Sequence, residues 1–271
     1  MPGGRGIRVA KGQAYGNDFL FVPEPDAAGL DITQLARAMC DRHAGVGADG
    51  LIVYALNGNH ATARFLNADG SPAEISGNGI RCLGALIVHT HQGKQAAPIV
   101  IDTPAGSRTL DFLERSGNRI TFRASMGQPR DIRVLELDAA GEKVRVVALS
   151  VGNPQCVVLG QSLDEQRMLR LGPALERHAA FPHRTNVSFV EVPSPESLRI
   201  LIWERGVGPT AASGTGACGA AVAAAAHGGA ARDVQVTSPG GTQRVEWRHD
   251  GIYLTGWAEL VFEGRWLAVS A

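Results

Sequence analysis

Short hydrophobic runs separated by polar turns dominate the chain and predict a protein rich in β-strands. Apolar residues at helical spacing are confined to segments at about residues 32–41, 78–91, 164–177 and 215–227. Strands are expected at residues 7–9, 19–22, 51–54, 63–66, 99–102, 109–113, 120–122, 143–149, 156–159, 187–192, 198–203 and 251–254. The strands do not alternate regularly with the helices, which favours the α+β class over a doubly wound sheet.

The same succession of elements occurs twice. In each copy a strand leads into a polar turn, then into a Ser-Gly-Xaa-Gly sequence, and then into an apolar helix. The first copy covers residues 64–70 and 76–82, and the second covers residues 199–206 and 213–218, an offset of 213 − 76 = 137 residues. The repeat predicts two similar domains that face each other across a cleft, with both helix N-termini at one shared site.

Composition narrows the classes of function. The 271 residues include 26 basic and 26 acidic ones, so a net charge of zero disfavours nucleic acid and anionic membrane as partners. A hydrophobic content of 44% is enough for a core, and no apolar run reaches the roughly 18 residues of a membrane span. Residues 1–6 are not followed by an apolar signal core, and four cysteines are not a disulfide framework, so a cytoplasmic protein is expected.

The repeated sequences place Ser76 and Ser213 at the N-caps of two helices. The first turn of a helix presents N–H groups without intrahelical partners, and the macrodipole adds positive charge there, so anions bind at such ends. Glycine at positions 77, 79, 214 and 216 removes side chains that would keep a ligand away. Serine is also a preferred N-cap in helices that bind nothing, so the residues alone leave a purely structural role open.

Two cofactor sites are disfavoured. Residues 214–219 fit the dinucleotide pattern Gly-Xaa-Gly-Xaa-Xaa-Gly, but about ten residues separate them from the preceding strand, where a tight turn is needed. The lysines, at positions 11, 94 and 143, are not near the Ser-Gly-Xaa-Gly elements, which disfavours a bound pyridoxal phosphate. No cofactor and no metal are predicted.

Eight short segments, in order along the chain, give it a resemblance to the diaminopimelate epimerase family of cofactor-independent amino-acid epimerases. They are GNDF at 16–19, RHAGVGADG at 42–50, NADGS at 67–71, GNGIRC at 77–82, GNP at 152–154, NV at 186–187, ERG at 204–206 and GTGAC at 214–218. The resemblance implies two pseudo-symmetric domains, each a sheet wrapped around a central helix, with the site in the cleft between them. The expected boundaries are 1–124, completed by a strand at 260–271, and 125–259.

In the resembled family, a two-base mechanism moves the α-proton of LL-diaminopimelate to give the meso form, a precursor of lysine and peptidoglycan. The resemblance implies that catalysis falls to Ser76, Ser213 and Glu204, and that the α-carboxylate is held at Gly77, Asn78, Gly214 and Thr215. It implies that the amino and distal groups of the substrate are bound by Asn17, Asn67, Asn153, Asn186 and Arg205. A small amino-acid substrate and a homodimer are the partners expected of such a protein.

The sequence departs from the family at the reacting positions. Ser76 and Ser213 stand where the family has its two catalytic cysteines, and Gln155 stands where it has a histidine. Cys82 and Cys218 lie inside the helices and are expected to be packing residues.

A serine hydroxyl is much less acidic than a thiol and needs an adjacent base, which could be Glu204 or a histidine such as His43. Three interpretations compete: a Cys-to-Ser variant that binds substrate and turns over slowly or not at all, a divergent racemase or hydroxy-amino-acid dehydratase that uses the serines, and an amino-acid-binding protein without activity. The retained distal residues favour an isomerase with altered proton-transfer residues.

Overall fold

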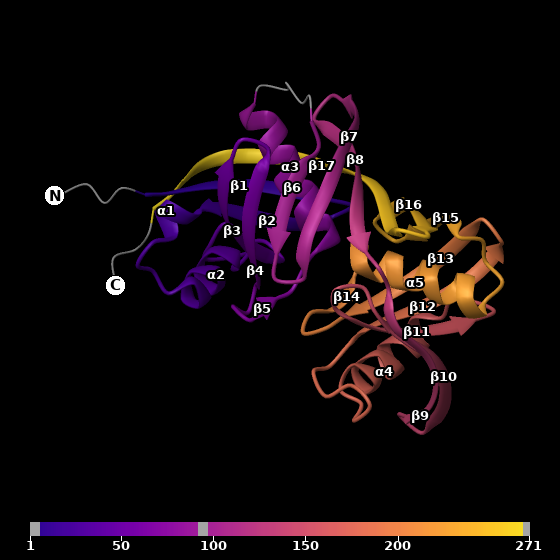
Figure 1. The fold of residues 1–271 in the computed structure, drawn as a ribbon. Helices are drawn as coiled ribbons and strands as arrows, with labels where there is room; N and C mark the ends of the chain where they lie inside the picture. Colours follow the sequence, from indigo (N-terminus) through magenta and orange to yellow (C-terminus); the bar gives the residue numbers. More distant parts are fainter. Residues whose placement is uncertain (1–5, 92–96, 268–271) are drawn as a thin grey trace. The chain divides into compact units, whose positions relative to one another are not determined.

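The structure, a computed structural model, describes residues 6–91 and 97–267, and the chain divides into two compact units (Figure 1). Unit 1 is Met1–Phe122 with Trp257–Ala271, and unit 2 is Arg123–Gly256. Before the boundary the chain forms β1 (Ile7–Ala14), β2 (Asn17–Pro23), α1 (Glu24–Ala27), α2 (Ile32–Cys40), β3 (Gly50–Asn57), β4 (His60–Asn67), β5 (Pro72–Ala73), α3 (Gly77–Thr90), β6 (Ile99–Thr103) and β7 (Gly106–Ser116).

Two strands, β8 and β17, run through the boundary between the units. The elements from there on are β8 (Arg119–Gly127), β9 (Arg130–Ala139), β10 (Glu142–Ser150), β11 (Pro154–Gly160), α4 (Glu165–Glu176), β12 (Asn186–Ser194), β13 (Ser197–Glu204), β14 (Gly208–Thr210), α5 (Gly214–His227), β15 (Asp233–Ser238), β16 (Gly241–Arg248) and β17 (Gly251–Trp266). Strands predominate and the helices are few, which confirms the α+β class.

The sheet of unit 1 follows a mixed order. β2 pairs in parallel with β3, β3 antiparallel with β4, β4 in parallel with β6, and β6 antiparallel with β7. β1 lies between β2 and β17, and both of its pairings are antiparallel. α3 packs against β1 and β2 with every residue from Gly77 to Val88 buried, as expected of a helix that is apolar on all sides.

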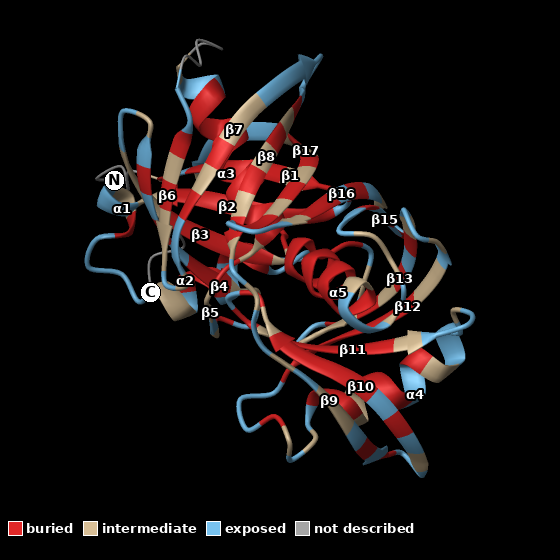
Figure 2. Ribbon diagram, turned by 45° about the vertical axis from the view of Figure 1, so that its right-hand side comes forward, coloured by how far each residue is buried: buried red, intermediate tan, exposed pale blue. Residues whose placement is uncertain are grey.

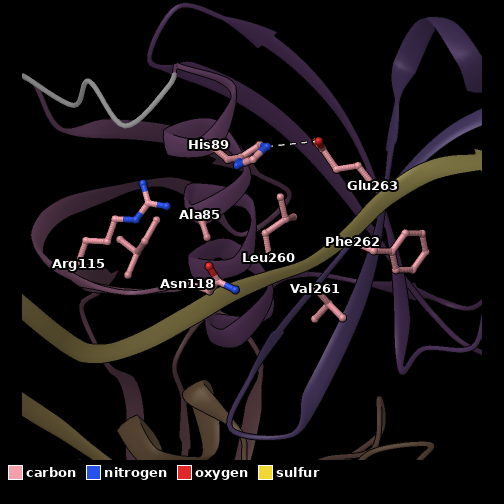
Figure 3. Close-up of a pocket in the computed structure, with 9 residues that line it drawn as sticks. Ala85, His89, Arg115, Asn118, Leu260, Val261, Phe262 and Glu263 are labelled. Atoms are coloured by element: carbon pink, nitrogen blue, oxygen red, sulfur yellow. Dashed lines mark ion pairs between the residues drawn. The ribbon is translucent and has the colours of Figure 1, made fainter.

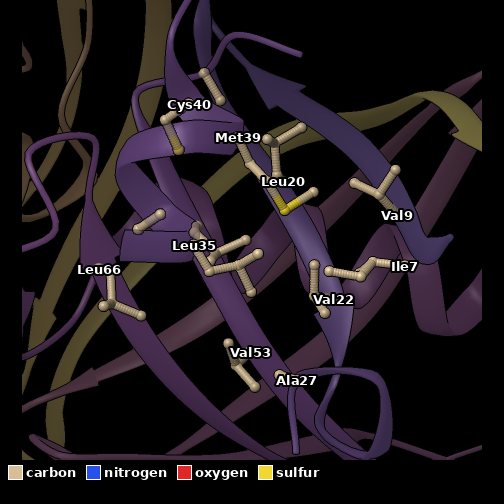
Figure 4. Packing of buried hydrophobic residues seen from close by; sticks show 13 residues of the cluster. Ile7, Val9, Leu20, Val22, Ala27, Leu35, Met39, Cys40, Val53 and Leu66 are labelled. Atoms are coloured by element: carbon tan, nitrogen blue, oxygen red, sulfur yellow. The ribbon is translucent and has the colours of Figure 1, made fainter. Parts of the chain in front are cut away.

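A second layer of unit 1 is formed by α2. Asp31 caps this helix by accepting hydrogen bonds from the Thr33 and Gln34 N–H groups, and the buried stripe of the helix faces the sheet. Figure 4 shows Leu35 and Met39 directed toward Leu20 and Val22 of β2. The sheet of unit 1 therefore carries an apolar core beneath α2 as well as the buried α3.

Unit 2 repeats this order. β11 pairs in parallel with β12, β12 antiparallel with β13, β13 in parallel with β15, and β15 antiparallel with β16. α5 packs against β10, β11, β12, β13, β15 and β16 and is buried from Gly214 to Ala224 (Figure 2). α4 covers a separate cluster with Met168, Leu171 and Leu175. Each unit is thus a sheet around one central helix with a second helix outside.

The predicted elements differ from the observed ones mainly in the strands. Residues 251–254 are the start of β17, which continues to Trp266, and β9, β15 and β16 were not predicted. These strands alternate exposed polar or charged residues with apolar ones, and their apolar runs are too short to be recognised by themselves. The four long helices begin and end within one residue of the predicted limits. Residues 268–271 of the expected final strand lie outside the described part of the chain. Within the described ranges, no helix has the length and apolar character needed to span a membrane.

Candidate active site

Ser76 caps α3 in unit 1, as the sequence predicts. Its backbone is extended, with φ −128° and ψ 121°, and its Oγ accepts a hydrogen bond from the Gly79 N–H at 3.0 Å. The hydrogen bonds of the helix itself begin with Ile80, whose N–H donates to the Ser76 carbonyl at 2.9 Å. The N–H groups of Gly77 and Asn78 therefore precede the helical ladder, at the end of α3 that favours an anion.

Ser213 caps α5 in unit 2 in the same way. Its φ is −140° and its ψ is 126°, and its Oγ accepts from the Gly216 N–H at 3.1 Å. The Ala217 N–H donates to the Ser213 carbonyl at 3.0 Å, so the N–H groups of Gly214 and Thr215 precede the ladder of α5. Each unit thus carries a serine hydroxyl beside two backbone N–H groups at a helix N-terminus.

Two of the flanking glycines serve the packing of the helices. At Gly79 a Cβ would lie 3.0 Å from Ile52 Cδ1 and 3.1 Å from Phe65 Cε1, so the glycine lets the first turn of α3 approach the core. At Gly216 a Cβ would lie 3.2 Å from Ser213 Oγ. Packing against the protein itself therefore favours glycine at these two positions, and a role of these glycines in ligand access stays a prediction.

Side chains behind Ser76 form a hydrogen-bonded chain. Arg81 Nη2 donates to Asn78 Oδ1 at 2.5 Å, Asn78 Nδ2 donates to Asn17 Oδ1 at 3.0 Å, and Asn17 Nδ2 donates to Asp49 Oδ2 at 2.7 Å. Asn78 and Arg81 are fully buried, and the Arg81 guanidinium lies 5.8 Å from the ring centre of Tyr15. The structure therefore brings together the predicted residues Asn17 and Asn78, and it directs the Asn78 amide into the protein, so only the backbone N–H of Asn78 lies at the helix end.

A cluster of charges holds this chain in place. Asp18 forms ion pairs with Lys11 at 2.8 Å and with Arg42 at 2.7 Å, and Arg42 also pairs with Asp49 at 2.8 Å. Burial of the Asp18 carboxyl opposes ionisation, but the hydrogen bonds from Arg42 and Lys11 outweigh it, so the pKa of Asp18 is lowered. Asp49 has no assigned role in the sequence interpretation, yet it orients Asn17; its place in the RHAGVGADG segment is the only sequence signal for it.

A second chain lies behind Ser213. Gln155 Nε2 donates to Asn153 Oδ1 at 2.7 Å, Asn153 Nδ2 donates to Thr215 Oγ1 at 3.3 Å, and the hydroxyls of Thr215 and Ser213 lie 3.5 Å apart. Gln155 is 1% exposed and packs on α5, where a Cβ at Gly219 would lie 3.0 Å from Gln155 Cγ. The residue in the histidine position of the resembled family is thus joined to the reacting position through two side chains.

Glu204 and Arg205 lie on a turn at the end of β13. The Val207 N–H donates to the Glu204 carbonyl at 3.0 Å, and Gly206 has φ +78°, a conformation that favours glycine. Asn186 Oδ1 accepts from the Arg205 N–H at 3.0 Å, and its Nδ2 donates to the Pro154 carbonyl at 3.1 Å. The predicted residues Asn186 and Arg205 therefore lie together, with the Asn186 amide holding the turn to the neighbouring strand.

Glu176 at the end of α4 supports the same turn and was not predicted. Its carboxylate is almost fully buried and accepts from Trp203 Nε1 at 2.8 Å and from the Gly206 N–H at 3.1 Å. Arg184 lies 3.7 Å from it. No sequence pattern distinguishes this glutamate from the solvent-facing acids of a helix.

Two other residues of the sequence interpretation lie apart from these chains. The Asn67 amide donates to Ser71 Oγ at 2.9 Å, within the turn that follows β4. In the described ranges, no hydrogen bond links Asn67 to the first turn of α3. His43 is exposed in the loop after α2, where its N–H donates to Asp41 Oδ1 at 2.7 Å.

The four cysteines all lie in the described ranges, and all are free and buried. Cys82 and Cys218 are fully buried within α3 and α5. Burial raises the pKa of the Cys82 thiol to about 12, and that of Cys156 also to about 12. A thiol with this pKa is protonated at neutral pH, so Cys82 acts as a packing residue.

A surface pocket of about 270 Å³ in unit 1 contains none of the predicted site residues (Figure 3). Its lining includes exposed Val261 and Phe262 of β17, and an ion pair of 3.3 Å joins His89 to Glu263 at its edge. In residues 6–91 and 97–267, no group of three or more His, Cys, Asp or Glu side chains is arranged to hold a metal ion.

Comparison with known proteins identifies relatives across the whole chain. The family model described as diaminopimelate epimerase matches residues 9–132 and 147–261. A diaminopimelate epimerase of Desulforudis audaxviator is 42% identical over 282 residues, which cover 96% of this chain and 99% of the relative. One of Desulfitobacterium hafniense is 40% identical over 277 residues, covering 95% and 97%.

Solved structures share the fold at low sequence identity. A predicted epimerase from Pseudomonas aeruginosa has a TM-score of 0.75 at 16% identity, covering 97% of this chain and 100% of that one. A hydroxyproline epimerase from Agrobacterium vitis, with bound trans-4-hydroxy-L-proline, has a TM-score of 0.72 at 14% identity, covering 97% and 92%.

Proposed function

The chain belongs to the diaminopimelate epimerase family, a family of isomerases, and we propose that it moves the α-proton of an amino acid without pyridoxal phosphate. The substrate to test first is LL-diaminopimelate, after the names of the relatives. One observation carries the proposal: both units have a serine hydroxyl at a helix N-cap, beside two N–H groups that precede the helical ladder. A proton-transfer group beside a carboxylate-binding group is what inversion at an α-carbon requires.

The N–H groups of Gly77 and Asn78, together with those of Gly214 and Thr215, bind the α-carboxylate in this proposal. Removal of the α-proton leaves a carbanion whose charge extends into that carboxylate, and the N–H groups and helix dipoles stabilise it. The alkoxide of one serine takes the proton as the C–H bond breaks. The hydroxyl of the other serine gives a proton to the opposite face, so a new C–H bond forms and a new alkoxide remains.

The serines make this chemistry slow compared with that of a thiol pair. A free thiol titrates near pH 8.5, whereas a serine hydroxyl is far less acidic, so only a small fraction is present as alkoxide. Glu204 is the carboxylate proposed to assist the removal of the proton, because Gln155 has no basic group. The amino and distal groups of the substrate are assigned to Asn17, Asn67, Asn153, Asn186 and Arg205.

Incubation with LL-diaminopimelate in heavy water tests the proposal. We expect slow exchange of the α-hydrogen and slow formation of the meso isomer, both abolished in the double variant Ser76→Ala, Ser213→Ala as the matched control. Binding without exchange or inversion would overturn the isomerase function and leave an amino-acid-binding protein. A keto or imino product from a hydroxylated amino acid would instead indicate a dehydratase.

Restoring cysteine at both positions is the companion test. We expect Ser76→Cys with Ser213→Cys to raise the epimerisation rate strongly, since the N–H groups are already in place. Failure to gain activity would implicate Gln155 or a different substrate.

The four free thiols are typical of a reducing compartment, so the proposal includes a cytoplasmic location. A homodimer stays a prediction.

A further inference from the structure

The two hydrogen-bonded chains behind the serines run in opposite directions. In unit 1 the chain starts at Arg81, which can only donate, and ends at Asp49, which as a carboxylate can only accept. Arg81 and Asp49 therefore fix the orientation of the Asn78 and Asn17 amides between them. Asn78 donates to Asn17, so the donors of this series point away from Ser76. Among the described residues, Ser76 Oγ accepts one hydrogen bond, from the Gly79 N–H.

In unit 2 the chain leads toward the serine. Asn153 Nδ2 donates to Thr215 Oγ1, and the Thr215 and Ser213 hydroxyls lie 3.5 Å apart, where either can be the donor. A Ser213 alkoxide cannot donate, so in that state the Thr215 hydroxyl is the donor and Ser213 Oγ accepts from two groups, the Thr215 hydroxyl and the Gly216 N–H at 3.1 Å. Gln155 fixes the direction by donating to Asn153 Oδ1.

The burial of this second chain strengthens its effect. Gln155, Asn153, Thr215 and Ser213 are each at least 92% buried. Gln155 Nε2 donates to Asn153 Oδ1, and in the described part of the chain Gln155 Oε1 has no hydrogen-bond partner. Because these side chains are largely withdrawn from solvent, hydrogen bonds to Ser213 Oγ act at a lower local dielectric than in water.

We infer that Gln155, Asn153 and Thr215 are positioning residues that make Ser213 the more acidic hydroxyl of the pair, so that Ser213 carries the negative charge and takes the α-proton while Ser76 delivers one. This inference rests on the proposed function. Two hydrogen-bond donors stabilise an alkoxide better than one donor does. When the two serines together carry one negative charge, that charge resides on the more acidic hydroxyl. When Ser213 takes the proton, the C–H bond breaks and its O–H bond forms; on the other face the Ser76 O–H bond breaks and the new C–H bond forms.

Cysteine substitutions measure the two environments without any turnover. Ser76→Cys and Ser213→Cys are titrated singly by the ultraviolet absorbance of the thiolate, with the wild-type protein subtracted. Subtraction of the wild-type titration removes the native thiols; burial raises the pKa of Cys40, Cys82 and Cys156 to about 12, and Cys218 is fully buried within α5. We expect the thiol introduced by Ser213→Cys to have the lower pKa.

Removal of the Thr215 hydroxyl gives the decisive comparison. In the Ser213→Cys background, Thr215→Val should raise the pKa of the introduced thiol by about 1, because a hydrogen bond to the charged form is lost, and Thr215→Ser should restore it. In the Ser76→Cys background, Thr215→Val should change nothing, which controls for general effects of the substitution. Gln155→Met should raise the pKa of the Ser213→Cys thiol by releasing Asn153.

Equal pKa values at the two positions, or no response to Thr215→Val, would overturn the inference. Circular dichroism of each variant shows whether it is folded, and Gln155→Met provides an independent perturbation if Thr215→Val is not. The thiol pKa values can be measured whether or not the protein is an isomerase. Different pKa values at the two positions, in a protein that shows no α-proton exchange, would uphold the hydrogen-bond asymmetry and refute the isomerase activity.

Discussion

Glu176→Gln should destabilise unit 2, because the Glu176 carboxylate accepts two hydrogen bonds that a carboxamide cannot both accept. The donors are Trp203 Nε1 at 2.8 Å and the Gly206 N–H at 3.1 Å, and they reach different oxygens of the carboxylate. After the substitution, the NH₂ group must face one of these N–H groups. One of the two donors then loses its acceptor.

The structure sets the size of this effect. An unsatisfied N–H costs about 1–3 kcal/mol when it is buried, and toward the lower end here, because Trp203 is half-buried and Gly206 is exposed. The ion pair with Arg184 adds at most about 1 kcal/mol, because the Arg184 side chain is 55% exposed and its charge is screened. We expect a loss of about 1–2 kcal/mol in the free energy of unfolding. Loss of the hydrogen bond from Gly206 would also loosen the turn that carries Glu204 and Arg205.

Urea unfolding followed by circular dichroism measures the effect, provided that the slope of the transition is unchanged. Glu191→Gln is the matched control, because Glu191 pairs with Arg199 at 3.1 Å while their side chains are 20% and 59% exposed. It should cost about 0.5 kcal/mol or less. Equal stabilities of Glu176→Gln and Glu191→Gln would refute the assignment of the buried carboxylate as an anchor of the turn.

Three further predictions concern buried groups. Within the described ranges the hydroxyl of Ser188 is buried without a hydrogen-bond partner. Ser188→Ala should therefore leave the free energy of unfolding unchanged or raise it by about 1 kcal/mol. A clear loss of stability in urea unfolding would contradict this. The pKa of Asp18 is lowered by folding, so its ion pairs with Lys11 and Arg42 stabilise the protein above the ordinary value near 3.8, and this stability is lost as the pH falls through the folded value. Asp18→Asn should remove that part of the pH dependence in acid titrations of stability; an unchanged profile would argue against it. Because burial raises the pKa of the Cys82 thiol to about 12, iodoacetamide at neutral pH should leave it unmodified until urea unfolds the chain, as mass spectrometry can check.

The sequence predicted the elements whose causes are local. A serine followed by glycine and an apolar helix is enough to place the N-caps at Ser76 and Ser213, because capping involves atoms within three residues. Because that pattern occurs twice, the sequence predicted both central helices, α3 and α5. The strand β9 was missed because charged residues alternate with its apolar ones, and its pairing with β10 depends on residues that come later in the chain.

The hydrogen bonds of the site could not be predicted from local sequence. Asn17 and Asn78 are separated by 61 residues, and Asn153 and Thr215 by 62, so only the folded sheets bring them together. The resemblance selected these asparagines, but it did not indicate that the amides of Asn78 and Asn186 are already bonded to the protein. The local sequence likewise did not indicate that a Cβ at position 79 would meet Ile52 and Phe65, so that packing also favours glycine there.

The pairing of β1 with β17 has a consequence for the order in which the protein forms during translation. Ile7 pairs with Trp266, so β1 leaves the ribosome long before the strand that covers this edge of it. Unit 2 is synthesised in full during that interval, and its sheet pairs strands that are close in time, so it can fold first. A chain that stalls or is cleaved before β17 leaves one edge of β1 with bare N–H and C=O groups, a strand edge at which nascent chains aggregate.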